Sequence, residues 1–526
     1  MAADRRLTVG MLCAFLVLGC SGKGQGDGGS PSQPAAGPSD PAAGPGSDGG
    51  VVAGGTPGGD IDGGPAAGAP DAGVLLEPPF TRNGWTFYGT SQGLSADVSD
   101  VSPDEGGNVY VAGSDAVYAK TRTDQRFLRF DALNAGLTQN CYAVADPNDP
   151  AQLDRNLHPT PPGPPLLCPV ISVGGAASGV AMIGFQGVGT DGDPDADWAQ
   201  DSGGADLVAF DGTNLTRTRH VFIASPPHTI CGVSGEAHTS TCSFPGDWFW
   251  VKGRRKLRQV FRIAANHDPG SSMYGDVWMG GTHATLAAYV NNAAARGWVD
   301  DTVGWEPKWA DARDVWEHDH PAITAANGTF LTGYTYALAI DPRNGTPWGH
   351  NGFRLASMSG GYGGNVSSKL WWLPLPWIDV WPDSGDPQQF PSFDAVMSLS
   401  FCKDGTMWMG SAGQGLARRD PGTGAISTLG LPDPATHGDS ATAVACDPSD
   451  GSVWIGLGWG GVMRLKDGAF TLIDPTGLPD FARHQVLSIQ IDRWASPRVI
   501  YFAFLPVKDA NGKVTAPGGV AAYDGP

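Results

Sequence analysis

The sequence predicts an all-β fold, a seven-bladed β-propeller whose last blade is completed by an N-terminal strand. The first observation behind this prediction is an internal repeat. The unit at 393–418 aligns closely with the unit at 441–464, and their tryptophans, Trp408 and Trp454, are 46 positions apart. A period in the forties, with three or four short strands separated by Asp-Gly turns, is typical of a propeller blade.

Weaker copies of the same unit extend over the rest of the region, and they are the second observation. Each copy has a short apolar run that ends in or close to glycine. Together with the two close copies they make seven units, of which those within 137–390 are enlarged by insertions. The weaker copies are Asn108–Gly113, Gly179–Gly184, Gly275–Gly280, Asn344–Gly349, and a C-terminal unit with Val486–Ile489 and Gly518–Gly525.

The two ends of the repeat region complement each other, which is the third observation. In the better copies, a segment such as Val462–Gly468 turns directly into a fourth strand, here Ala469–Ile473. The last unit ends at Tyr523–Gly525 without a fourth strand, and the region begins with one, Gly84–Tyr88. We therefore expect these two segments to pair and close the ring, which removes exposed sheet edges.

Composition restricts the partners of this protein. The formal net charge is −20, from 33 Lys+Arg and 53 Asp+Glu. An acidic surface repels phosphate backbones, so we expect no nucleic-acid partner. No apolar run long enough for a membrane-spanning helix occurs beyond the N-terminal segment.

The first 19 residues have the pattern of an export signal. Arg5 and Arg6 precede an apolar run, 7–18, that is too short to span a membrane as a mature helix and ends in Gly19 and Cys20. The cysteine directly after glycine resembles the lipobox of bacterial lipoproteins. That resemblance implies lipid attachment at Cys20, cleavage before it, and a lipid bilayer as partner. The alternative is an ordinary secreted protein.

A linker is predicted between this signal and the folded domain. Residues 20–79 are almost wholly Gly, Pro, Ala, Ser and Asp, and such a segment cannot bury enough apolar area to become ordered. The predicted organisation is thus a signal peptide at 1–19, the lipidated Cys20 with a disordered linker to 79, and a propeller domain at 80–526. Ser21, rather than Asp, after the cysteine favours the outer membrane, on its periplasmic or surface face.

The repeats resemble a known family. Gly-Leu, then Val-x-x-Val, then Asp-x-x-Gly-x-Val-Trp-Ile-Gly is similar to the two-component regulator propeller repeat of extracellular sensor domains. The sequence shows neither a transmembrane helix nor a kinase domain, so the resemblance implies the fold and ligand or protein binding, rather than signalling across a membrane. The matching positions are Gly93, Leu94, Val98, Val101, Asp104, Gly107, Asp404, Gly405, Trp408, Gly410, Asp450, Gly451, Trp454 and Gly456.

Cysteine usage fits export. Six cysteines follow Cys20, and an even number in an exported chain suggests disulfides. Cys141–Cys168 would clasp a Pro-rich insertion, and Cys231–Cys242 would close a small polar loop. Cys402 and Cys446 occupy equivalent repeat positions. We expect equivalent inner strands to lie farther apart than a disulfide allows, so a third bridge and two buried thiols both stay open.

One acidic loop has the composition of a calcium site. Four carboxylates alternate with other residues in a Gly-rich segment, and Ca²⁺ prefers six to eight hard oxygen ligands on a flexible loop. Ca²⁺ is therefore the one candidate cofactor, and a solvated acidic loop is the alternative. The four residues are Asp191, Asp193, Asp195 and Asp197.

Tryptophans gather in two insertions, interleaved with acidic residues. The spacing from Trp298 to Trp316 would place four of them on one helix face, and Gly304 and Pro307 limit that helix to Pro307–His318. Such rings suit sugar rings, and they equally suit core packing. The His318-Asp319-His320 triplet has metal-ligand residue types, with ordinary polar histidines as the alternative. The candidate ligand-binding residues are Trp305, Trp309, Trp371, Trp372, Trp377, His318 and His320.

These observations favour a non-enzymatic binding module of the bacterial cell envelope, with an unknown protein or glycan as ligand. Neither a His-Glu-x-x-His motif nor a phosphate-binding Gly-x-x-x-x-Gly-Lys-Ser/Thr loop occurs, so no catalytic residue is predicted. One alternative is a propeller enzyme, a polysaccharide lyase or hydrolase, that uses carboxylates and histidines at the mouth of the central channel. The other is a structural or adhesion protein of the envelope.

Overall fold

The computed structural model describes residues 77–141, 166–187, 203–221, 259–271, 273–281, 286–289, 315–319, 323–324, 330–331, 335–350, 355–358, 370–373 and 396–525. This part of the chain is all-β, with seven antiparallel sheets of four or five strands. Helices in it are short: α5 (Pro434–His437), and the 3-10 segments η1 (Thr90–Gln92) and η7 (Asp480–Arg483). None of its helices is long and apolar enough to cross a membrane.

Six sheets have four strands, each paired with the next along the chain. They are β3 (Val98–Pro103), β4 (Val109–Gly113), β5 (Ala116–Lys120), β6 (Leu128–Phe130); β9 (Val170–Gly175), β10 (Val180–Phe185), β11 (Ala205–Phe210), β12 (Leu215–Val221); β13 (Val260–Ala265), β14 (Val277–Gly281), β15 (Leu286–Tyr289), β16 (Val315–Asp319); β19 (Ala337–Ile340), β20 (Pro347–His350), β21 (Leu355–Met358), β22 (Leu370–Leu373); β23 (Val396–Phe401), β24 (Met407–Ser411), β25 (Leu416–Arg419), β26 (Ile426–Leu429); β27 (Ala441–Cys446), β28 (Val453–Leu457), β29 (Val462–Lys466), β30 (Ala469–Leu472).

The seventh sheet joins the two ends of the folded region. Its order is β31 (Val486–Asp492), β32 (Val499–Phe504), β35 (Gly519–Tyr523), β2 (Trp85–Tyr88) and β1 (Phe80–Arg82). Two-stranded sheets are formed by β7 (Asn140–Cys141) with β8 (Leu166–Leu167), β17 (Ile323–Thr324) with β18 (Phe330–Leu331), and β33 (Val507–Lys508) with β34 (Val514–Ala516).

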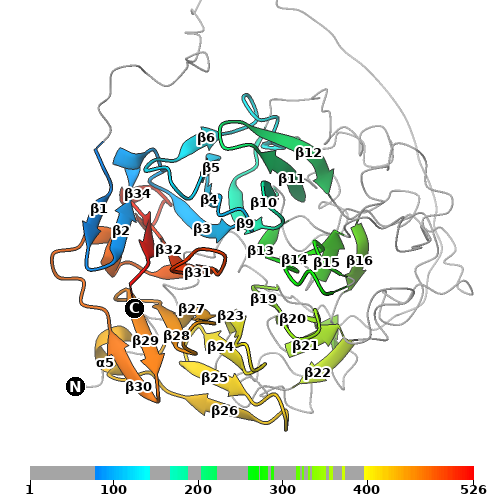
Figure 1. The fold of residues 1–526 in the computed structure, drawn as a ribbon, viewed down its shortest axis with the longest axis vertical. Coiled ribbons are helices and arrows are strands. Elements are labelled where there is room, and N and C mark those ends of the chain that lie inside the picture. The colour runs from blue at the N-terminus through cyan, green and yellow to red at the C-terminus, as the bar shows by residue number, and fades with distance from the viewer. Residues whose placement is uncertain are drawn as a thin grey trace, which may run out of the picture.

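The pairing of the two ends is the one that the sequence predicts. Trp85 lies opposite Tyr523, and Tyr88 opposite Val520. Figure 1 shows the blue N-terminal strands beside the red C-terminal strands. Trp85 is only 6% exposed and packs against Phe502 and Tyr523, so the closing strand contributes to the core as well as to the ladder. The additional strand β1 was not expected.

The first strands of the seven sheets contact one another in a closed cycle. In chain order, β3, β9, β13, β19, β23, β27 and β31 each contact the next, and β31 contacts β3. The sheets are accordingly arranged around a common centre, with the later strands of each sheet toward the outside (Figure 1).

Local structure explains why the repeat contains its Asp-Gly turn and its second-strand glycine. In the turn after β23, Asp404 accepts hydrogen bonds from the amide and hydroxyl of Thr406, and Gly405 adopts φ +87°, which favours glycine. Farther along, a Cβ on Gly410 would lie 2.4 Å from the carbonyl oxygen of Ala441, in the neighbouring sheet. The repeated glycine of the second strand thus lets adjacent sheets approach closely.

One helix prediction is wrong. The expected helix at Pro307–His318 is overturned at its end, because Val315–Asp319 forms strand β16 and pairs with β15. The sheet needs a fourth strand here, and ladder pairing overrides the helical spacing of the tryptophans. The expected signal peptide, Cys20 and the linker up to residue 76 lie outside the described residues.

Candidate functional site

A cavity of about 810 Å³ lies at the centre of the ring, and the first strands of all seven sheets line it. One position of the repeat faces it in every sheet, the fourth residue after the start of the unit's buried inner segment. Six of the seven residues there are serine, glycine or alanine, and these small side chains leave the centre open. The seven are Ser102, Gly174, Ala264, Ala339, Ser400, Ala445 and Gln490.

The first strands run parallel around this cavity. Each is an edge strand of its own sheet, so side chains must satisfy its outer backbone groups. Ser398 Oγ accepts the amide hydrogen bond of Val444 (3.0 Å), and Ser400 Oγ accepts that of Cys446 (2.9 Å). The second bond lies two residues farther along both strands, so the strands run in the same direction. The cavity therefore has a start end, where the first strands begin, and a turn end, where they lead into the turn before the second strands. A strand such as β31 separates these ends by ~20 Å.

At the start end, Arg262 of β13 reaches across the cavity. Its guanidinium donates hydrogen bonds to the carbonyl oxygens of Leu487 (2.7 Å) and Tyr336 (3.1 Å). It also lies 3.7 Å from the carboxylate of Asp100, and the two side chains are only 13% and 4% exposed. Asp100 in turn accepts the amide hydrogen bond of Val173. One arginine therefore joins several sheets.

Burial acts on both members of this ion pair. It raises the pKa of the Asp100 carboxyl, and Arg262, Ser488 and the surrounding amides partly oppose this rise. It lowers the pKa of Arg262, which Asp100 partly opposes. Each charge therefore depends on the other, as expected for a buried pair.

The turn end carries a different set of side chains. In each unit, the seventh residue after the start of the buried inner segment lies at this end. In the seven units that position holds Glu105, Ala177, His267, Pro342, Lys403, Pro448 and Arg493, and all of these except Glu105 and Ala177 line the cavity.

The turn after β31 is held by a buried carboxylate. Asp492 accepts two hydrogen bonds from the guanidinium of Arg122 (2.9 and 3.0 Å) and further bonds from the amides of Trp494 (3.1 Å) and Ala495 (3.0 Å). This arrangement fixes the backbone on either side of Arg493. Arg493 is accordingly presented from a rigid turn, although its side chain is exposed.

Aromatic and imidazole rings meet beside Arg493. Its guanidinium carbon lies 5.2 Å from the ring centroid of Trp494, and the ring of His267 makes an edge contact with Trp494 at 4.8 Å. His267 Nδ1 lies 3.0 Å from Glu105, whose other oxygen accepts a 2.6 Å hydrogen bond from Tyr274. Trp494 thus reaches from the turn after β31 to the turn after β13, across the end of the cavity.

The pKa values of this group fix its charges at neutral pH. Burial lowers the pKa of His267, with Glu105 opposing the shift, so the imidazole is neutral and Nδ1–H donates. Burial alone would raise the pKa of Glu105, but the hydrogen bonds from His267 and Tyr274 lower it overall, so it is ionised. Partial desolvation of the guanidinium lowers the pKa of Arg493, and the negative charge of Glu105 partly opposes this shift.

The cavity wall is cationic, although the protein as a whole is acidic. No aspartate or glutamate of the described ranges lines it. Arg498 is committed to Asp447 (2.6 Å) and to the carbonyl oxygen of Gly525. Among described residues, Lys403 Nζ and the Arg493 guanidinium have no hydrogen-bond or ion-pair partner. The cationic side chains of the wall are Arg262, Lys403, Arg493 and Arg498, with the neutral His267 among them.

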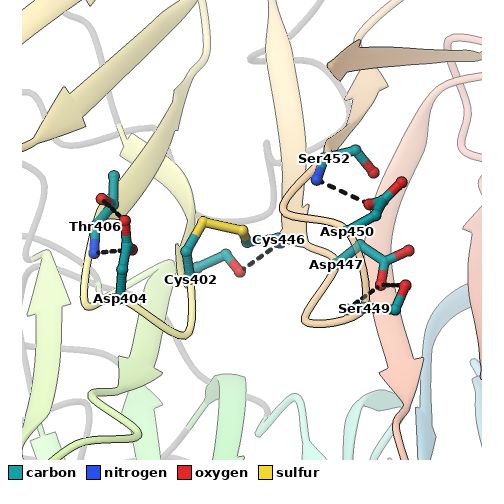
Figure 2. Close-up of a disulfide and its surroundings, with 9 residues drawn as sticks. Cys402, Asp404, Thr406, Cys446, Asp447, Ser449, Asp450 and Ser452 are labelled. Atoms are coloured by element: carbon teal, nitrogen blue, oxygen red, sulfur yellow. Dashed lines mark hydrogen bonds between the residues drawn. A yellow bond between two sulfur atoms is a disulfide. The ribbon is translucent and has the colours of Figure 1, made fainter. Parts of the chain in front are cut away.

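A disulfide ties two sheets together at the turn end. Cys402 and Cys446 follow or end β23 and β27, and their Cα atoms are 5.1 Å apart (Figure 2). The expectation that equivalent strands lie too far apart is therefore wrong, because the neighbouring strand ends converge here. Cys168 is also disulfide-bonded. The pairing of β7 with β8 places the backbone of Cys141 opposite Leu166, which is two residues before Cys168.

The structure places few of the ligand residues expected from the sequence. Trp371 and Trp372 lie in β22, and His318 lies in β16. The strands β22 and β16 are the outermost strands of their sheets, away from the cavity. In the described ranges, no group of three or more His, Cys, Asp or Glu could hold a metal ion. The expected sites at Trp305, Trp309, Trp377, His320, Asp191, Asp193, Asp195, Asp197, Cys231 and Cys242 lie outside the described residues.

The residues at the turn end could not be found by motif searches. Lys403, His267 and Arg493 share only a position in the repeat, and that position is held by a different residue type in almost every unit. Aligning all seven units on the start of the inner segment would have shown that two cations face one centre. The repeat itself carried that signal.

Comparisons with known proteins add little to this geometry. No family model matches the chain, and no curated protein matches it. Among solved structures, it is similar to the extracellular domain of a hybrid two-component system from B. thetaiotaomicron, with 13% identity and a TM-score of 0.42 over 85% of this chain. The chain spans 42% of that chain. It is also similar to a chain of the mitotic checkpoint complex, with 10% identity and a TM-score of 0.40, covering 87% of this chain and 98% of that chain. With TM-scores below 0.5, neither likeness carries an argument about fold or function.

Proposed function

We propose that this protein is an exported seven-bladed β-propeller that acts as a non-enzymatic binding module. The ligand enters the central cavity at its turn end. The single observation that carries this proposal is the cavity of about 810 Å³ shared by all seven sheets, a size common for small-molecule sites. The closed cycle of first strands and the β2–β35 pairing support the propeller.

Disulfides support an oxidising compartment. They persist in exported proteins and are rare in the cytosol. The Cys402–Cys446 bridge and the bonded Cys168 fit such a location. A lipid anchor at Cys20 in the outer membrane completes the proposal, and Cys20→Ser tests it: the variant should move from the membrane to the soluble fraction of the cell envelope. Wild-type protein found in the soluble fraction would contradict the anchor.

Filling the cavity tests the binding role. Ala264 faces the cavity and belongs to no core cluster in the described part of the chain, so Ala264→Trp should occupy ligand space with little effect on packing. Ser427→Trp, on an exposed site of β26, is the matched control. Small molecules screened against the full chain should raise the melting temperature of wild type and control only, and should be recovered unchanged. A ligand that stabilises Ala264→Trp equally would contradict the location.

One observation favours an enzyme as the second candidate. The Glu105–His267 pair, with its 3.0 Å contact, has the arrangement of an oriented general base at the mouth of the cavity. A polysaccharide lyase or hydrolase using this pair would convert its ligand, and Glu105→Gln would abolish the conversion while leaving binding intact. Conversion of any ligand that binds in the cavity would favour this candidate over the binding module.

A further inference from the structure

We propose that the turn end of the central cavity is an anion site, built by Arg493 and Lys403, for a small organic ligand that carries a carboxylate or phosphate group. The inference rests on the proposed binding function, because it specifies the chemistry of the same cavity.

Two cations at the wall have no hydrogen-bonded or ion-paired carboxylate among the described residues. Arg262 and Arg498 also line the cavity, but each has a carboxylate partner, Asp100 or Asp447. No described carboxylate forms a hydrogen bond or ion pair with Lys403 Nζ or the Arg493 guanidinium. Unpaired cations on a concave wall are less well hydrated than on an open surface, so an incoming anion gains more there.

Glu105, the carboxylate that acts electrostatically on Arg493, already has hydrogen-bond partners. Glu105 accepts hydrogen bonds from His267 and Tyr274, and it does not line the cavity. It interacts with Arg493 electrostatically, without a hydrogen bond. The guanidinium therefore keeps its N–H donors for a ligand, and its planar fork matches a carboxylate or a phosphate oxygen pair.

The arginine is also oriented in advance. Its backbone is held by the hydrogen bonds that Asp492 accepts from Trp494 and Ala495, and its guanidinium lies beside the ring of Trp494. A cation fixed in this way loses little side-chain entropy on binding. In addition, small residues such as Gly174 and Ala445 leave room for the body of the ligand.

The net charge of −20 makes this placement informative. Acidic residues outnumber basic ones, 53 to 33, yet no described carboxylate faces the cavity. An anion approaching the acidic exterior is repelled at long range, so selectivity must come from the wall itself. The ligand chemistry that this wall favours is thus opposite to what the whole-chain charge predicts.

A matched series of sugars tests the site on the full chain. Glucose, glucuronate and glucose 6-phosphate share one ring and differ in charge, and calorimetry gives their affinities. We expect glucuronate or glucose 6-phosphate to bind at least tenfold more tightly than glucose, and their relative affinities distinguish a carboxylate site from a phosphate site. The double variant Lys403→Gln with Arg493→Gln should lower the affinity for the anionic sugar by roughly 100-fold or more. Its affinity for glucose should hardly change.

The control changes the same charges elsewhere. Arg126 and Lys513 are exposed and do not line the cavity, so Arg126→Gln with Lys513→Gln alters the net charge equally. This double variant should keep wild-type affinity. Equal binding of glucose and both anions, or equal losses in the two double variants, would overturn the anion site while leaving the binding function in place. If none of the three sugars, and no other small molecule, binds to wild type, the proposed function fails as well.

Discussion

The two ends of the central cavity each hold an arginine, and the two arginines are used differently. At the start end, Arg262 is 13% exposed and bonded to two carbonyl oxygens and beside Asp100. At the turn end, Arg493 is exposed, flanked by Trp494, and has no carboxylate bonded to it among the described residues. The number of partners, rather than the residue type, separates a cation that holds the fold from one that is available to a ligand.

The same repeat frame produces both ends. Asp100 and Arg262 replace a residue that is serine in the sheets of Ser398 and Ser488, at the position just after the β-bulge of the first strand. There the exchange creates an ion pair between sheets. Arg493 is instead placed in a turn, beyond the ladder, where none of the described strands supplies a hydrogen-bond or ion-pair partner.

The largest expected effect is at the start end. Arg262→Met should lower the free energy of unfolding by about 3–5 kcal/mol, because it leaves the Asp100 carboxylate buried without its counter-charge. Urea denaturation of the full chain measures this. Adding Asp100→Asn should recover part of the loss, since the unpaired charge is then removed. A single variant as stable as wild type would show that the pair does not hold the ring.

The next effect concerns the disulfide at the turn end. The Cys402–Cys446 bridge closes 44 residues, and loop-closure entropy assigns it about 3–4 kcal/mol. Cys402→Ala with Cys446→Ala should therefore unfold at lower urea concentration under non-reducing conditions. Reducing agent should destabilise wild type by breaking this bridge, whereas the double variant has no such bridge to lose. Wild-type stability in the double variant would mean that the two residues are free thiols in the protein.

The smallest effect is the pH dependence of anion affinity. The pKa of His267 lies below its usual 6.5, so the imidazole stays neutral from pH 8 to 7 and affinity for glucuronate should be constant. As the pH falls through the lowered pKa, His267 becomes a third cation, facing Glu105, Asp104, Tyr274 and Arg493. Affinity should then rise by roughly two- to fivefold. His267→Gln should abolish the rise, and a rise already complete by pH 7 would contradict the lowered pKa.

Sequence reasoning predicted the all-β fold and the pairing of the two ends because the repeat is strong where the structure is regular. The units with Trp408 and Trp454 predict two four-stranded sheets, and the unmatched ends predict the β2–β35 pairing. It failed at β16, because helical spacing over a few tryptophans is a local signal that ladder pairing overrides. The strand distance at Cys402 was misjudged because convergence of strand ends is a three-dimensional property.

The site was missed for a related reason. Tryptophan clusters and acidic runs attract attention in a sequence, but Trp371 and His318 belong to outer strands. Lys403 and Arg493 are ordinary surface residues until the ring brings the turns of their sheets around one cavity. Only the closure of the sheets brings these two positions to the wall of one cavity.

One paired measurement tests the contrast between the two arginines most directly. Arg262→Met and Arg493→Met are each compared with wild type for the free energy of unfolding and for the affinity toward glucuronate. Arg493→Met should change stability by less than about 0.5 kcal/mol and weaken binding at least tenfold, whereas Arg262→Met should lose several kcal/mol of stability. Contradiction would come from Arg493→Met binding glucuronate like wild type, or being destabilised as strongly as Arg262→Met.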